Sequence, residues 1–393
     1  MTTRRLMQML LVVALLATLP AFAGCEKDDP TGISVKAKAE PIQGENVRIL
    51  FVGDTSFGES YRGTPRRLKK RGYNFPLKKM KPLLQSSTYV IANLETPITD
   101  LPESPYKKTK AYTHWTHVEH APVTLKKHNI TAFGLANNHT LDFGTPGLQQ
   151  TFAIMRDHGL KCFGAGMNRD EASAPLVKRF TVGEQQFKIA AIAAFEYSRK
   201  YDMAYHFYAD NESPGAYRLS AKRIGRQIKK IKDKDPDAFV IVYPHWGGNY
   251  HWKNKKQTKM GHALIDAGAD MIIGHGGHCM QEIEFYNNKW IIYGLGNFVF
   301  LSPGRYAKFK TPQYSYGAQL IVEQSGGKLN KRMRLYPFLS NNKRTKFQPR
   351  PLNEEMFEDF IKELLTKSPL DKKARKRLKR GQDEGGRFVE FAI

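Results

Sequence analysis

The chain has 393 residues and a formal net charge of +25, from 62 Lys and Arg against 37 Asp and Glu. Its length is enough for one large folded domain or two smaller ones. With only three cysteines, the chain is neither a disulfide-built scaffold nor a holder of a cysteine-rich zinc or iron–sulfur site. The excess positive charge favours a polyanionic partner, which can be nucleic acid, anionic lipid or an acidic polymer.

The first 24 residues have the order of a secretory signal peptide. Arg4 and Arg5 precede the apolar run 9–17, and small residues follow at 21, 23 and 24. The run is shorter than the roughly 20 apolar residues that span a bilayer. We therefore expect residues 1–24 to be a signal peptide and the mature protein to lie outside the cytoplasmic membrane. That location argues against nucleic acid as the partner.

Two processing routes fit this segment. Ala21-x-Ala23 suits ordinary cleavage before Gly24, whereas Ala23-Gly24-Cys25 resembles a bacterial lipobox, which would leave Cys25 lipidated. We favour the lipoprotein, because residues 25–45 then form a polar linker between a lipid in the membrane and a folded domain.

Short apolar or β-branched runs alternate with amphipathic stretches from residue 46 to about 340. One such stretch, 148–158, has Thr145 as its predicted N-cap, Pro146 in its first turn and Gly159 as its stop, and another covers 260–267. This alternation predicts an α/β domain with buried, largely parallel strands. The predicted strands are 47–52, 89–92, 130–135, 188–193, 238–243, 270–273 and 290–293.

Residues 341–393 have a different pattern. The segment 353–367 predicts an amphipathic helix, and 388–393 suits a final strand. Between them, seven basic side chains fall within nine residues. This basic run is either the solvated end of a helix or a docking site for a polyanion. Its members are Lys372, Lys373, Arg375, Lys376, Arg377, Lys379 and Arg380.

Polar motifs with ligand chemistry follow five of the predicted strands. The carboxyl ends of strands in an α/β sheet meet at one edge, where ligands bind. Carboxylate, imidazole and amide groups together suit a divalent transition metal such as Mn, Zn or Fe, and their number is enough for one or two ions. The motifs are Gly53-Asp54, Asn93-Leu94-Glu95, Asn137-Asn138-His139 with Asp142, His245-Trp246-Gly247, and Gly274-His275 with His278.

These motifs, with Gly164-Ala165-Gly166 and Leu295-Gly296-Asn297-Phe298, give the sequence a family resemblance. Over roughly residues 47–302 it resembles the CapA-type family, which is associated with poly-γ-glutamate capsule synthesis. The resemblance implies a metallophosphatase-like α/β fold, in which helices flank a sandwich of two mixed β-sheets and a metal site lies at the strand ends.

The resemblance also implies roles for single residues. His139 falls where related phosphoesterases place the histidine that protonates the leaving group, and we count Asp142 of the same motif as a second catalytic candidate. Ser56 stands where those enzymes have a histidine, and Gly276 and Gly277 replace residues that are often His and Pro. The implied metal ligands are Asp54, Glu95, Asn138, His245, His275 and His278.

The sequence is compatible with three functions. The leading one is an envelope-anchored CapA-like protein that acts in synthesis, export or anchoring of an anionic polymer of the poly-γ-glutamate type, with other capsule-synthesis membrane proteins as further partners. The second is a metal-dependent phosphoesterase that acts on an envelope phosphate ester. The third is a lipoprotein that binds a polyanion without catalysis.

Overall fold

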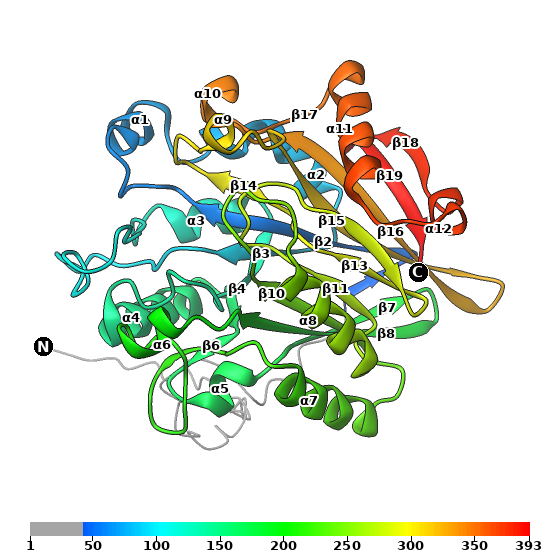
Figure 1. Ribbon diagram of the computed structural model, residues 1–393, viewed down its shortest axis with the longest axis horizontal. Coiled ribbons are helices and arrows are strands. Elements are labelled where there is room, and N and C mark those ends of the chain that lie inside the picture. The colour runs from blue at the N-terminus through cyan, green and yellow to red at the C-terminus, as the bar shows by residue number, and fades with distance from the viewer. Residues whose placement is uncertain (1–41) are drawn as a thin grey trace, which may run out of the picture.

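A computed structural model describes residues 42–393. Two mixed β-sheets pack face to face, and helices cover their outer faces (Figure 1). This architecture confirms the predicted α/β sandwich. The predicted signal peptide, Cys25 and most of the predicted linker lie outside the described residues. Within the described range, no helix combines the length and the apolar character needed to span a bilayer.

The larger sheet contains ten strands among the described residues, in the order β18-β19-β16-β15-β2-β3-β4-β5, with β14 paired to β2 and β17 to β16. Its centre is parallel from β2 to β5, and β15 runs antiparallel to β2. The strands are β2 (Asn46–Ser56), β3 (Tyr89–Leu94), β4 (Ile130–Gly134), β5 (Lys161–Phe163), β14 (Asn297–Phe300), β15 (Tyr314–Ser325), β16 (Lys328–Leu339), β17 (Arg350–Pro351), β18 (Lys379–Asp383) and β19 (Gly386–Ala392).

The smaller sheet has the order β1-β7-β8-β10-β11-β13-β12, and β8, β10, β11 and β13 are parallel. A separate short ribbon joins β6 (Ala165–Gly166) to β9 (Gly215–Ala216). The strands of the smaller sheet are β1 (Ile42–Gly44), β7 (Leu176–Val182), β8 (Gln185–Phe195), β10 (Phe239–His245), β11 (Met271–Ile273), β12 (Ile283–Tyr286) and β13 (Lys289–Ile292).

Alternation along the strands builds the layers. In β2, Val47, Ile49 and Phe51 enter the core between the sheets, whereas Leu50 and Val52 face the helices on the outside. Because both faces of the strand are buried, its sequence is almost continuously apolar. All seven predicted strand segments are confirmed, because a strand buried on both faces requires an apolar run.

Helices cover each outer face with apolar side chains. The outer face of the larger sheet packs against α1 (Thr64–Arg71), η1 (Phe75–Met80), α2 (Lys81–Gln85), α3 (Ala121–Lys127) and α4 (Gly144–Asp157). The outer face of the smaller sheet packs against α5 (Arg169–Ser173), α7 (Ala221–Lys234) and α8 (Lys255–Asp266). The remaining helices are α6 (Arg199–Met203), α9 (Tyr306–Phe309), α10 (Asn342–Thr345), α11 (Glu354–Lys367) and α12 (Lys372–Lys376).

Two helices begin earlier than the sequence pattern predicts. Helix α4 starts at Gly144, and Phe143 rather than Thr145 is its N-cap, because the amide of Gly147 already bonds to the carbonyl of Phe143. Helix α8 starts at Lys255, where Asn254 and Gln257 form a capping box. The first turn of α8 is polar, so apolar periodicity does not reveal it.

The C-terminal segment joins the sandwich. Strand β19 pairs with β16, and α11 places Phe357, Phe360 and Leu364 in the core between the sheets. The basic run lies in α12, in β18 and, for Arg377, in the turn between them, and its seven basic side chains are exposed. One of them, Arg380, forms an ion pair with Glu358 at 2.8 Å.

Candidate metal centre

The strand ends of both sheets meet at one edge of the sandwich. In Figure 1 the arrowheads of β2 and β10 both point to this edge, on the left of the view. Asp54 lies near the end of β2, Glu95 directly follows β3, and His245 ends β10. A bridge between His245 and His275 brings in the loop after β11, which also carries His278. The five predicted ligands from these segments therefore converge.

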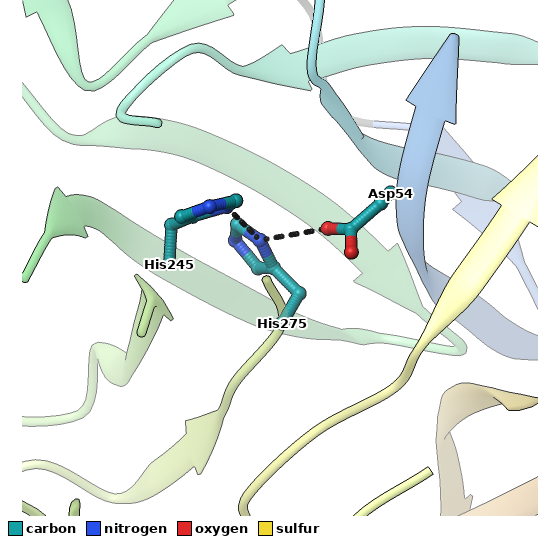
Figure 2. Close-up of side chains that lie close together, drawn as sticks. All are labelled: Asp54, His245 and His275. Carbon is teal, nitrogen blue, oxygen red and sulfur yellow. Dashed lines mark hydrogen bonds and ion pairs between the residues drawn. The ribbon is translucent and has the colours of Figure 1, made fainter. Parts of the chain in front are cut away.

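Asp54, His245 and His275 form a first group of ligand atoms, and Figure 2 shows their side chains turned toward one another. The Nδ1 atoms of the two histidines lie 3.2 Å apart, and Nδ1 of His275 lies 3.5 Å from Oδ1 of Asp54. Two nitrogen ligands of one tetrahedral ion, each about 2.05 Å from it, lie roughly 3.3 Å apart. The spacing of the histidines therefore suits a single metal ion.

Asp54, Glu95 and His278 form a second group. Nε2 of His278 lies 3.8 Å from Oε1 of Glu95, and its Nδ1 lies 3.1 Å from Oδ2 of Asp54 and 2.9 Å from Oδ1 of Asn297. Because the amide oxygen of Asn297 only accepts, Nδ1 of His278 donates and Nε2 faces Glu95. Asp54 belongs to both groups, so it would contribute a ligand to an ion held by either.

Several buried oxygens of this centre have no hydrogen-bond partner among the described residues. They are both carboxylate oxygens of Glu95, Oδ2 of Asp54 and Oδ1 of Asn138. Glu95 and Asp54 are completely buried. Buried unpaired carboxylate oxygens are unfavourable unless a cation or a donor compensates them. These residues therefore fit a divalent metal, through oxygen and imidazole ligands.

The pKa values of Glu95 and His278 also favour a bound cation. Burial raises the pKa of Glu95 well above its ordinary value, and the charge of Asp54 raises it further. Burial alone would lower the pKa of His278, but the carboxylates of Glu95 and Asp54 outweigh it and raise this pKa to about 9. Without metal, a proton on His278 partly neutralises the carboxylates, and a bound cation would replace it.

Next to the ligand groups lies a hydrogen-bonded series that ends on His139. Nδ1 of His139 donates to Oδ2 of Asp142 at 2.6 Å, and Nζ of Lys110 lies 2.7 Å from Oδ1 of Asp142 and 3.2 Å from Nδ1 of His139. Nε2 of His139 therefore points at the centre, 3.8 Å from Oε1 of Glu95. Burial, followed by the charge of Lys110, lowers the pKa of His139 well below its ordinary value.

The other predicted positions are arranged differently. Asn138 is half-buried beside the centre and belongs to neither ligand group. Ser56 accepts a hydrogen bond from the amide of Gly58. Gly276 has φ +100°, and a Cβ there would lie 2.9 Å from Nε2 of His245. Glycine at 276 thus leaves the space that the ring of His245 occupies, and its amide donates to Asp54 at 3.1 Å.

Sequence reasoning missed Lys110 and His114. Both lie in the irregular segment between β3 and α3, where no strand end marks them. The ring of His114 packs on that of His139 with centroids 3.8 Å apart. Asn93 lies in one of the sequence motifs, but the pattern does not indicate its role. Its Nδ2 donates to Oδ1 of Asp54 at 2.9 Å and so orients that carboxylate.

Comparisons with known proteins agree on one family. Residues 48–302 match the family model described as "Bacterial capsule synthesis protein PGA_cap". The chain is 30% identical over 261 residues to the capsule biosynthesis protein CapA of Bacillus anthracis, covering 66% of this chain and 61% of that one. It is 31% identical over 264 residues to the PGA biosynthesis protein CapA of Bacillus subtilis, covering 67% of this chain and 66% of that one. The chain thus spans less than two thirds of either relative's length.

Among solved structures, a novel phosphatase from Mycoplasma pneumoniae aligns with 80% of this chain and 96% of its own, with 13% identity and a TM-score of 0.35.

Proposed function

Because the chain belongs to the family of bacterial capsule synthesis proteins, we propose that it acts in the synthesis, export or anchoring of an anionic polymer of the poly-γ-glutamate type, through a centre for one or two divalent metal ions. The observation that carries the proposal is the position of Asp54, which belongs to both ligand groups. The unpartnered oxygens of Glu95 support it, because they offer a cation two further ligand atoms.

The residues around the centre have separate roles in this proposal. Asp54, His245 and His275 would hold one ion, and Asp54, Glu95 and His278 would hold a second. Divalent ions bound there supply Lewis acidity toward the bond to be broken and toward water. Asp142 fixes Nδ1 of His139, so Nε2 is free to accept a proton on the side of Glu95 and to pass it to the leaving group. Lys110 holds Asp142 in place.

Elemental analysis of the purified full chain tests the centre. We expect one or two Mn, Zn or Fe ions per chain, fewer in His245→Ala or His278→Ala, and none in the double variant, because each substitution removes a ligand. The control is His158→Gln, which changes a histidine at the end of α4, outside both groups. Stoichiometric metal in the double variant would contradict the assignment.

A second candidate is hydrolysis of an envelope phosphate ester. It is favoured by the position of His139, whose Nε2 faces the centre as a proton donor to a leaving alkoxide would. Turnover of a chromogenic phosphodiester with added Mn²⁺ would support this candidate, provided that His139→Gln abolishes it without loss of metal. Retention of poly-γ-glutamate by metal-free protein with no turnover would instead favour a binding protein without catalysis.

We also propose that the protein is exported and lipid-anchored through Cys25, where it would meet other membrane proteins of capsule synthesis. The support is the lipobox-like order Ala23-Gly24-Cys25 in the sequence. Two or three acyl chains would hold the protein stably, at about 0.8 kcal/mol for each buried CH₂ group. Cys25→Ser should release the protein from membranes, and the intact mass of the mature chain distinguishes a lipidated Cys25 from an unmodified Gly24.

A further inference from the structure

A cleft lies over the candidate metal centre. Two cavities of about 210 and 270 Å³ share the lining residues Tyr61, Tyr112, His278 and Arg305 and therefore form one cleft. The smaller cavity also reaches Asn138 and His139. A ligand in this cleft would lie against both the second ligand group and the imidazole that faces it.

The charged side chains of the cleft are all basic. No Asp or Glu among the described residues lines either cavity, whereas Lys110, Lys200 and Arg305 do. Lys110 is buried and bonded to Asp142. Lys200 is exposed on α6, Arg305 is half-buried at the start of α9, and neither has a carboxylate within 4 Å in residues 42–393. These two cations are available to a ligand.

Aromatic rings support both cations. The guanidinium of Arg305 lies 5.1 Å from the ring centroid of Tyr112, and Nζ of Lys200 lies 5.7 Å from that of Tyr205. Such contacts reduce the freedom of the long side chains before a ligand arrives. In Figure 1, α6 lies below the end of β2 and α9 lies above it, so the two cations belong to different elements around the cleft.

We propose that Lys200 and Arg305 are specificity-determining residues that bind carboxylates of the substrate on either side of the metal centre. An acidic chain that enters the cleft approaches the carboxylates of Asp54 and Glu95, and the two cations offset that repulsion. The planar guanidinium of Arg305 suits a carboxylate through two parallel hydrogen bonds. This inference rests on the proposed function, and it adds which residues select the acidic substrate.

Binding of a short acidic oligomer to the metal-loaded full chain tests the inference. The probe is fluorescently labelled tetra-γ-glutamate, and the neutral comparison is tetra-γ-glutamine. We expect the wild-type chain to bind the acidic tetramer at least about tenfold more tightly than the neutral tetramer. The variant Lys200→Gln/Arg305→Gln should bind the acidic tetramer about tenfold more weakly than the wild type does, which is the effect of losing two partly exposed ion pairs.

The matched control removes the same charge elsewhere. Lys222→Gln/Arg226→Gln on the exposed side of α7 should bind the tetramer as the wild type does. Fluorescence anisotropy measures the affinities, and metal content is measured on each sample. If the Lys200→Gln/Arg305→Gln variant binds as tightly as the wild type, or if the neutral tetramer binds equally well, the inference is wrong. If the wild-type chain holds no metal, that result would count against the proposed function and not against this inference.

Discussion

Replacing Lys110 with Met should strongly destabilise the protein. Nζ of Lys110 lies 2.7 Å from Oδ1 of Asp142 and 2.8 Å from the carbonyl oxygen of Tyr112, and the side chains of Lys110 and Asp142 are 5% and 0% exposed. Met keeps the apolar stem and removes the cation. The carboxylate of Asp142 then stays buried with two donors, the amide of His114 and Nδ1 of His139.

The expected loss is about 3 kcal/mol in the free energy of unfolding at pH 8. Removing one partner of a buried ion pair costs roughly 3–5 kcal/mol, and the two remaining donors place this case at the lower end. The double variant Lys110→Met/Asp142→Asn should lose about 1–2 kcal/mol less unfolding free energy than the two single variants lose together, because the second substitution removes the unpaired charge.

The loss should depend on pH. Burial raises the pKa of Asp142 to about 6 against the opposing effect of Lys110, so removing Lys110 raises it further. A carboxyl whose pKa is raised in the folded state contributes stability at low pH and loses it as the pH rises through the folded pKa. Above pH 6, Asp142 keeps its proton in the folded Lys110→Met variant but not in the folded wild type. The difference in unfolding free energy between the two therefore grows by at most about 1.4 kcal/mol per pH unit.

Urea unfolding at pH 5.5 and pH 8 measures these differences. The matched control is Lys188→Met, whose ion pair with Asp235 also spans 2.7 Å but has side chains that are 17% and 31% exposed. It should cost less than about 1 kcal/mol at both pH values. A loss below about 1 kcal/mol for Lys110→Met at pH 8, or an equal loss at both pH values, would refute the reasoning.

Three further predictions test the fold and the basic run. Gly53→Ala should cost more than about 3 kcal/mol in thermal unfolding, because its Cβ would lie 1.8 Å from the carbonyl oxygen of Gly296; wild-type stability would contradict this close approach of strands. Phe360→Ala in α11 should cost about 3–5 kcal/mol by urea unfolding, since the ring is fully buried; a loss below about 1 kcal/mol would mean that α11 does not support the core. Replacing all seven basic residues of the run by Gln should flatten the salt dependence of poly-γ-glutamate binding, which is screened over about 10 Å at 0.1 M salt, and leave metal content unchanged; equal binding across the salt series would make the run a solvated surface.

The sequence alone determined the positions of the main strands and of the residues at their ends. Both are local properties: a strand buried on two faces requires an apolar run, and the first polar residue after the run lies at the sheet edge. For that reason the order of residues is enough to place Asp54, Glu95 and His245 each at the end of a strand. The basic run was equally visible, because it is contiguous.

Only the tertiary structure decided how these groups are shared and supported. That Asp54 serves both ligand groups depends on the packing of two sheets, which no local pattern encodes. Lys110 reaches Asp142 from an irregular segment 32 residues earlier in the chain. The pairing of β19 with β16, which makes the C-terminal segment part of the sandwich, also joins distant residues. Such contacts are specified by complementary shape and charge between separate segments, so they become visible only when the chain is folded.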